Sequence, residues 1–358
     1  MPELAPAPER ATATQAADGR DAPAAAPAAQ GASGPASPRS RTATILSVAT
    51  ELPSGRLTSA EIAARLGITE QWILSRTGIR ERRQAAPEER LSDYAARAGA
   101  SALAQAGVPA TDVDLVIVAT MTQDELTPNT APLVAHALGA HGAGALDVGA
   151  ACTAFISGLS LGAAQIESGR AETVLLVGAD FITRITDYDD KRTAPLFADA
   201  AGAVVLGGTD RGGGSIGPIV LGADGSHGAT ITASQAERKL RMDGPEVFRH
   251  AVARMGEVTL EAVGRAGLKL EEIDLFVYHQ ANARITHALA ERFELPAERV
   301  VDCIEGLGNA SAATLPVALA AAQRDGRLRP GARVLLSAFG AGFTWGGGVI
   351  EWGPGSDG

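Results

Sequence analysis

Cysteine is scarce in this chain, and its scarcity excludes two common ways of stabilising a protein. Only two cysteines, Cys152 and Cys303, occur among the 358 residues. Two cysteines cannot form a disulfide framework, and neither stands at the spacing of a metal-binding pair. Such a chain is most simply located in a reducing compartment, so we expect a cytoplasmic protein with no metal site.

Excess positive charge and long apolar runs are also missing. Asp and Glu number 41 against 31 Lys and Arg, a net charge of −10, so general nucleic-acid binding is not expected. No stretch offers the roughly 18 uninterrupted apolar residues that a transmembrane helix needs, so no membrane partner is expected. The first residues also lack the charged start and apolar centre of a signal peptide.

Residues 1–40 differ in composition from the rest of the chain. They are mainly Ala, Pro, Ser and charged residues, with almost no large apolar side chains. Such a segment cannot offset the entropy cost of ordering, so a disordered tail is predicted. From residue 41 onward apolar strands alternate with Ala-rich helices, which is typical of an α/β protein whose buried sheets are covered by helices.

The α/β part of the sequence repeats itself. Residues Ala102, Ala106, Gly107, Asp114 and Leu115 recur 160 positions later as Ala262, Ala266, Gly267, Asp274 and Leu275. A second phrase, from Ala163 to Val177, recurs in the same order from Ala321 to Ser337. We therefore predict two duplicated α/β halves, residues 41–210 and 211–358, joined at the Gly-rich stretch 209–217.

Three side chains of catalytic type follow or precede predicted elements at comparable corners of the two halves. Cys152 stands between an apolar strand and a helical stretch, where helix amides and the macrodipole favour a thiolate nucleophile. His279 follows the strand 275–278, and Asn309 precedes another Ala-rich helix. Because ligands bind at the carboxyl ends of strands in α/β sheets, we expect these three side chains to share one site. Cys303 has no comparable surroundings and is interpreted as buried packing.

Five motifs, in order along the chain, resemble those of one enzyme family. They are Trp72–Arg82, Ala150–Cys152, His279–Asn282, Gly308–Ala313 and Phe339–Gly346. Over about residues 42–352 the chain resembles β-ketoacyl-acyl-carrier-protein synthase III of the thiolase superfamily. The resemblance implies a thiolase-like fold, usually a homodimer, and a decarboxylating Claisen condensation of acyl-CoA with malonyl-acyl carrier protein in fatty acid or polyketide biosynthesis. It implies no cofactor, since acyl-CoA is a substrate.

The resemblance also implies a role for each catalytic candidate. Cys152 resembles the nucleophile that takes the acyl group, and His279 and Asn309 resemble the pair that binds the malonyl thioester carbonyl. Loss of carbon dioxide leaves an enolate whose oxygen needs preorganised hydrogen-bond donors, which imidazole and carboxamide can supply. The backbone amides of Cys152 and Ala341 resemble the oxyanion hole for the tetrahedral intermediates.

Contacts to coenzyme A and to the carrier protein are implied by the same resemblance. Trp72 resembles the residue that stacks on adenine, and Arg192 is assigned as the arginine opposite it. Arg76 and Arg284 resemble contacts to phosphate or to the carrier near the tunnel mouth. A basic rim that includes Arg249 and Arg284 would suit an acidic carrier protein.

The sequence departs from the family in two places, and two alternative functions remain possible. Ala198 and Ala200 stand where the family commonly has glycine, so the identity of the acyl starter is undetermined. The stretch 227–240 is polar and unlike the family. The same thiol and His279 could instead pass an acyl group to an alcohol or amine, with His279 as general base. The third hypothesis is a noncatalytic subunit that binds carrier protein.

Overall fold

The computed structural model describes residues 41–211 and 213–353, all within one compact unit, so the tail predicted for residues 1–40 lies outside the described residues. The helices are α1 (Ser59–Leu66), α2 (Glu70–Thr77), α3 (Leu91–Ala106), α4 (Thr130–Leu138), α5 (Ala154–Glu167), α6 (Gly244–Arg265), α7 (Ala283–Arg292) and α8 (Thr314–Arg324). The strands are β1 (Ala43–Glu51), β2 (Gly55–Thr58), β3 (Glu81–Gln84), β4 (Leu115–Ala119), β5 (Gly144–Val148), β6 (Thr173–Phe181), β7 (Asp199–Gly208), β8 (Ser215–Ile216), β9 (Val220–Ala223), β10 (Ile231–Ala233), β11 (Leu240–Met242), β12 (Leu275–Tyr278), β13 (Arg333–Gly340) and β14 (Thr344–Glu351).

Two five-stranded sheets form the framework. The first has the order β1-β7-β6-β4-β5, with β4 parallel to β5 and β6, and β7 antiparallel to β1 and β6. The second has the order β12-β13-β14-β8, with β9 also on β14; β12 and β13 are parallel and β14 is antiparallel to its neighbours. All strands of the first sheet precede residue 209 and all strands of the second follow residue 214. The division at residue 210 as a domain boundary stays a prediction.

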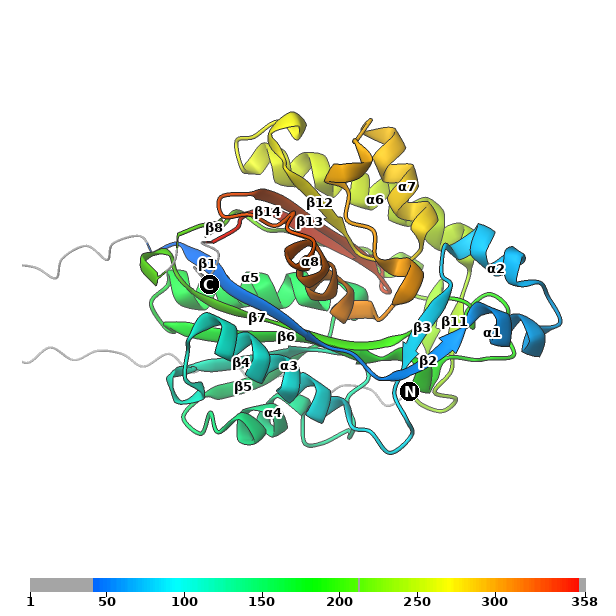
Figure 1. The fold of residues 1–358 in the computed structure, drawn as a ribbon, viewed down its shortest axis with the longest axis horizontal. Helices are drawn as coiled ribbons and strands as arrows, with labels where there is room; N and C mark the ends of the chain where they lie inside the picture. Colours follow the sequence, from blue (N-terminus) through cyan, green and yellow to red (C-terminus); the bar gives the residue numbers. More distant parts are fainter. Residues whose placement is uncertain (1–40, 212, 354–358) are drawn as a thin grey trace, which may run out of the picture. The chain divides into compact units, whose positions relative to one another are not determined.

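Helices cover both sheets and also separate them, as Figure 1 shows. Helices α5 and α8 lie between the sheets, α3 and α4 cover the first sheet from outside, and α6 and α7 cover the second. The core between the sheets is apolar and fully buried, for example at Phe155, Leu176, Leu315 and Leu336. The predicted architecture of buried sheets covered by helices is therefore confirmed.

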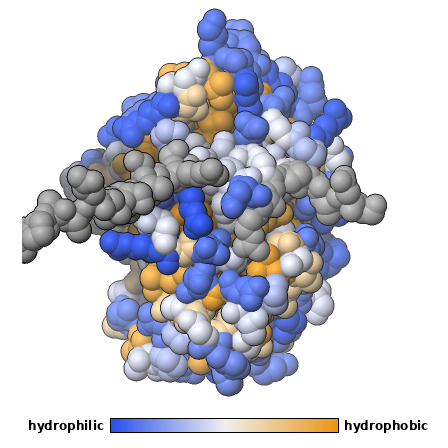
Figure 2. Space-filling view, turned by 90° about the vertical axis from the view of Figure 1, so that its left-hand side faces the viewer, coloured by the Kyte–Doolittle hydropathy of each residue, from blue (hydrophilic) through white to orange (hydrophobic). Residues whose placement is uncertain are grey.

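The surface is mixed rather than apolar. On the face in Figure 2, hydrophilic residues surround smaller apolar patches, which is usual for a folded domain in water. None of the described helices has both the length and the apolarity that crossing a membrane requires. The edge strand β5 leaves Leu146 38% exposed, so the apolar run that leads to Cys152 is only partly covered.

The repeat read in the sequence recurs in the structure with the same offset. Strand β4 begins at Leu115 and β12 at Leu275, while β6 begins at Thr173 and β13 at Arg333. One-turn 3₁₀ helices, Ala151–Thr153 and Ser311–Ala313, precede α5 and α8. Gly107 directly follows α3, and Gly267 lies two residues after the end of α6. Their φ angles are 63° and 69°, a left-handed conformation that favours glycine. The duplicated α/β fold is thus confirmed.

Candidate active site

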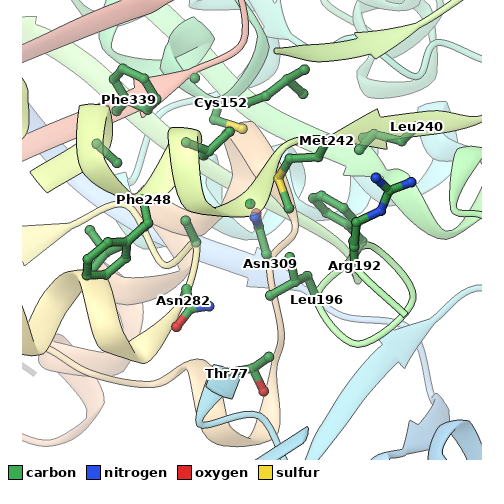
Figure 3. A pocket seen from close by; sticks show the side chains of 18 of the residues that line it. Thr77, Cys152, Arg192, Leu196, Leu240, Met242, Phe248, Asn282, Asn309 and Phe339 are labelled. Carbon is green, nitrogen blue, oxygen red and sulfur yellow. The ribbon is translucent and has the colours of Figure 1, made fainter. Parts of the chain in front are cut away.

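Residues from both halves of the sequence line one pocket of about 540 Å³. Its lining includes every predicted site residue: Trp72, Arg76, Cys152, Arg192, His279, Arg284, Asn309 and Ala341. In the view of Figure 3, Cys152 and Phe339 lie toward one end and Thr77 and Asn282 toward the other. Residues more than a hundred positions apart in the sequence therefore face one cavity, as the duplicated halves predicted.

Cys152 lies at the tight corner predicted for it. It is the middle residue of the 3₁₀ turn Ala151–Thr153 that leads directly into α5, and Ala151 has a φ of 47°. Removal from water raises the pKa of the Cys152 thiol to about 11, with a further rise from the buried Asp180 and a partial offset from a Ser311 hydrogen bond. The helix N-terminus by itself favours the thiolate, but desolvation outweighs its pull and holds the pKa of Cys152 above its ordinary value.

The raised pKa of Cys152 predicts how the thiol reacts with iodoacetamide. With a pKa of about 11, the thiolate fraction should rise about tenfold for each unit of pH through the neutral and mildly alkaline range. The measurement is the alkylation rate of Cys152 by intact-protein mass spectrometry, made in a Cys303→Ala background so that a single thiol is followed. A rate that levels off near neutral pH would contradict the assignment.

Asn309 is fixed so that its amide nitrogen remains a donor. The side-chain oxygen Oδ1 accepts a hydrogen bond of 2.9 Å from the N–H of Ser311, which orients the carboxamide. The backbone of Asn309 is tied to the strand region before β7, donating to Leu196 O and accepting from Ala198 N, both at 2.9 Å. Asn309 is buried. Its Nδ2 is therefore a preorganised donor at the pocket wall.

His279 is a neutral imidazole whose tautomer depends on one hydroxyl. Burial lowers its pKa to about 3, so the ring is uncharged at neutral pH. Its Nδ1 lies 2.5 Å from Thr314 Oγ1, and that hydroxyl also lies 2.9 Å from Ser311 O. When Thr314 donates to Nδ1, the other nitrogen, Nε2, carries the proton and can donate; when Thr314 donates to Ser311, Nε2 accepts. No pattern in the sequence singled out Thr314.

The repeat explains why the N–H of Cys152 is available. Asp180 and Gly340 occupy equivalent positions, at or next to the ends of β6 and β13. Asp180 uses its carboxylate to bind the N–H of Ala312, which is the repeat counterpart of Cys152, at 3.1 Å. Gly340 has no side chain, and a Cβ there would lie 2.9 Å from Cys152 N. The glycine therefore leaves this amide to a ligand.

A methyl group at position 340 should obstruct the Cys152 amide. We expect Gly340→Ala to slow acylation of Cys152 by roughly tenfold to a hundredfold, because the added Cβ crowds an amide that would bind the developing oxyanion. The measurement is the single-turnover acylation rate with acyl-CoA. Gly149→Ala is the matched control, since a Cβ there meets no atom within 4 Å. Equal rates in the two variants would exclude the crowding.

Each of the basic residues assigned to coenzyme A has a partner in the structure. Arg76 lies over the ring of Trp72 at 4.3 Å, whereas Arg192 forms an ion pair of 3.0 Å with Asp190. Arg284 lies over the ring of Phe248 at 5.1 Å. Arg249 is exposed, pairs with Glu246 and is not among the residues that line the pocket. The assignment of Arg192 opposite Trp72 stays a prediction.

The two departures from the family lie beside the pocket. Ala198 is buried next to Phe197, Ala200 is buried in β7, and neither has a positive φ. Their methyl groups pack with Ala310, Ala313 and Val317. The alanines therefore fill space behind Asn309 without forcing an unusual turn.

The polar stretch 227–240 contributes apolar pocket residues. It contains β10, which pairs with β11 in a two-stranded hairpin. Ile231, Leu240 and Met242 from this hairpin line the pocket. Cys303, interpreted as buried packing, is partly buried, and its N–H donates to Gln280 Oε1 at 3.0 Å.

Comparisons with known proteins cover nearly all of the described part. The family model 3-oxoacyl-[acyl-carrier-protein] synthase III matches residues 146–225, and its C-terminal counterpart matches residues 263–352. A β-ketoacyl-[acyl-carrier-protein] synthase III of Rhizorhabdus wittichii is 41% identical over 318 residues, 87% of this chain and 100% of that protein.

Solved structures give the same result. The 3-oxoacyl-[acyl-carrier-protein] synthase III of Aquifex aeolicus VF5 superposes with a TM-score of 0.84 at 38% identity, covering 87% of this chain and 100% of its own. A priming β-ketosynthase of a polyketide biosynthetic pathway superposes with a TM-score of 0.85 at 36% identity, covering 90% and 99%. The two family models span Cys152 on one side and His279 and Asn309 on the other. The chain has the thiolase-like fold and belongs to the β-ketoacyl-acyl-carrier-protein synthase III family.

Proposed function

We propose that this chain condenses an acyl-CoA starter with malonyl-acyl carrier protein to give a β-ketoacyl-acyl carrier protein, through an acyl group held on Cys152. The observation that carries the proposal is the arrangement of one pocket. It combines a thiol, a neutral imidazole and an oriented carboxamide with an amide left open by Gly340. Family membership supports the same reaction, in fatty acid or polyketide biosynthesis.

The first half-reaction is thioester exchange. The Cys152 sulfur attacks the acyl carbonyl, the bond to the coenzyme A sulfur breaks, and the thiol proton leaves with coenzyme A. Since the pKa of Cys152 is about 11, the resting sulfur is mainly the thiol, and its proton passes to the departing coenzyme A thiolate in the course of the exchange. The amides of Cys152 and Ala341 would bind the oxygen of the tetrahedral intermediate.

The second half-reaction forms the carbon–carbon bond. Malonyl thioester loses carbon dioxide, and the electron pair passes to an enolate oxygen that His279 Nε2 and Asn309 Nδ2 would hold. The enolate carbon attacks the Cys152 thioester, the carbon–sulfur bond breaks, and the sulfur leaves as a thiolate that takes a proton from solvent. Enolate binding requires the tautomer in which Thr314 donates to His279 Nδ1. A neutral imidazole suits this role because it donates a hydrogen bond to the enolate oxygen and keeps its proton.

The deciding experiment follows carbon dioxide and the acyl group together. Purified protein is loaded from a panel of acyl-CoAs, the Cys152 adduct is read by intact mass, and malonyl-acyl carrier protein labelled at the free carboxyl is added. We expect carbon dioxide release coupled to loss of the adduct. Transfer of the acyl group to an alcohol or amine without carbon dioxide would overturn the proposal in favour of an acyltransferase. Failure of every acyl-CoA to acylate would favour a noncatalytic subunit.

Trp72 should affect coenzyme A binding rather than chemistry. We expect Trp72→Ala to raise KM for acyl-CoA roughly tenfold with little change in kcat, because stacking on adenine is the same in ground and transition states. Acyl-pantetheine, which lacks adenine, should show no such change. The measurement is steady-state kinetics with both donors, and Arg192→Ala tests the assigned partner in the same way. A KM effect of equal size with acyl-pantetheine would contradict adenine stacking.

The remaining parts of the proposal concern assembly and location. We propose a homodimer in the cytoplasm that uses no resident cofactor, as the family resemblance implies. Arg284 at the pocket, and the exposed Arg249 nearby on α6, would meet the acidic carrier protein.

A further inference from the structure

Three metal-ligating side chains outside the proposed reaction meet beside the start of α6. His227 belongs to the one-turn 3₁₀ helix Gly225–His227, while Glu246 and His250 stand four residues apart on one face of α6. One ligand atom from each of the three lies within 4.8 Å of the other two. None of them has a task in the condensation.

The distances are close to those of a metal site. Glu246 Oε1 and His250 Nε2 are 2.9 Å apart. A tetrahedral zinc ion with ligand bonds near 2 Å places its ligand atoms roughly 3.4 Å apart, which is comparable with the 2.9 Å of this pair and within the 4.8 Å that spans the cluster. The side chains of His227, Glu246 and His250 are 33%, 28% and 19% exposed, so an ion from solvent can reach them.

Two of the ligands rest on a rigid support. The rings of His227 and His250 pack on Phe343 at centroid distances of 5.2 and 5.1 Å, and Phe343 is almost fully buried. The backbones of Asp224 and Phe343 also exchange two hydrogen bonds, of 2.8 and 2.7 Å, which fix the loop that carries His227. Preorganisation of this kind lowers the entropy cost of binding an ion.

The neighbouring charges fit a bound cation. The carboxylate of Asp224 lies 3.9 Å from His227 Nε2, too far for a hydrogen bond, and adds negative charge beside the cluster. Arg249 donates to Glu246 Oε1 and would have to leave that oxygen for an ion to bind; its side chain is 69% exposed, so solvent can take over its hydrogen bonds. No described residue hydrogen-bonds the second carboxylate oxygen of Glu246.

We propose that His227, Glu246 and His250 bind one divalent transition-metal ion of the zinc type. Two imidazoles and a carboxylate are ligands that zinc accepts, and a water would complete the tetrahedron. The spacing of the cysteines predicted no metal site, and that prediction did not include these three ligands, which come together only in the fold. Phe343, on which both histidine rings pack, stands two residues after Ala341 of the proposed active site. Metal binding to the cluster is nevertheless measured without enzyme turnover.

The test is metal binding by the full chain after treatment with a chelator. Titration with Zn²⁺, followed by calorimetry, should give one ion per chain. His227→Ala and His250→Ala should each lower the affinity by at least about tenfold, and Glu246→Gln, which keeps the side-chain shape, should also weaken binding. Co²⁺ should give the visible bands of a tetrahedral N/O site.

The control uses another pair of neighbouring histidines. His136 and His141 have ring centroids 6.0 Å apart, and neither belongs to the metal-ligating group found among the described residues. The double variant His136→Ala/His141→Ala should bind Zn²⁺ as the unmodified chain does. Absence of binding, binding that persists in both His250→Ala and Glu246→Gln, or a sulfur-to-cobalt charge-transfer band from a cysteine would each overturn the proposal.

Discussion

Cys152→Ala should remove the acyl-enzyme altogether and slow condensation by a factor on the order of 10³ or more, since no other thiol can take the acyl group. Cys303, the other cysteine of the chain, packs against Gln280 and is not among the residues that line the pocket. Decarboxylation of malonyl-acyl carrier protein should continue in Cys152→Ala, because His279 and Asn309 are unchanged. The measurements are intact mass after incubation with acyl-CoA and release of labelled carbon dioxide.

Cys303→Ala is the matched control for this prediction. It removes the same functional group from a position with no proposed role, so it should acylate and condense like the unmodified protein. An adduct of normal yield on Cys152→Ala would mean that another residue carries the acyl group, and the proposed nucleophile would be wrong.

Asn309→Asp should have the converse effect: acylation proceeds and decarboxylation falls by about 10² to 10³. The aspartate keeps an oxygen to accept the hydrogen bond from Ser311 N, which is 2.9 Å long in the structure, so the local backbone should hold. It loses the Nδ2 donor and places a negative charge where the enolate oxygen would form. The change thus removes the proposed chemistry with little change of shape.

The Asn309 prediction is measured as the carbon dioxide release rate on preloaded acyl-enzyme. Asn129→Ala is a control at an asparagine that precedes α4 and makes no capping side-chain hydrogen bond. Because burial holds the pKa of His279 at about 3, its ring should add no pH dependence to this rate between mildly acidic and alkaline pH. Normal decarboxylation by Asn309→Asp would remove the carboxamide from the mechanism.

Apolar periodicity and the glycines at helix ends were sufficient to predict most of the fold from the sequence. Strands such as Leu115–Ala119 and Leu275–Tyr278 are short apolar runs, and helices such as Leu91–Ala106 end before a glycine that takes a left-handed conformation. These are local effects of backbone and side-chain chemistry, so a linear pattern records them. The offset of 160 residues then placed Cys152, His279 and Asn309 at related corners, and all three line one pocket.

The properties that the sequence did not contain arise from contacts between distant segments. Burial raised the pKa of Cys152, where the helix N-terminus alone favoured a thiolate. Thr314 gained its partner His279, and Gly340 its position against Cys152 N, only when the two halves packed together. The sequence by itself therefore determined the α/β elements, their duplication and the reactive side chains. The tertiary structure alone decided their protonation, their orientation and which backbone amide stays open, because desolvation and hydrogen bonding depend on neighbours brought together by folding.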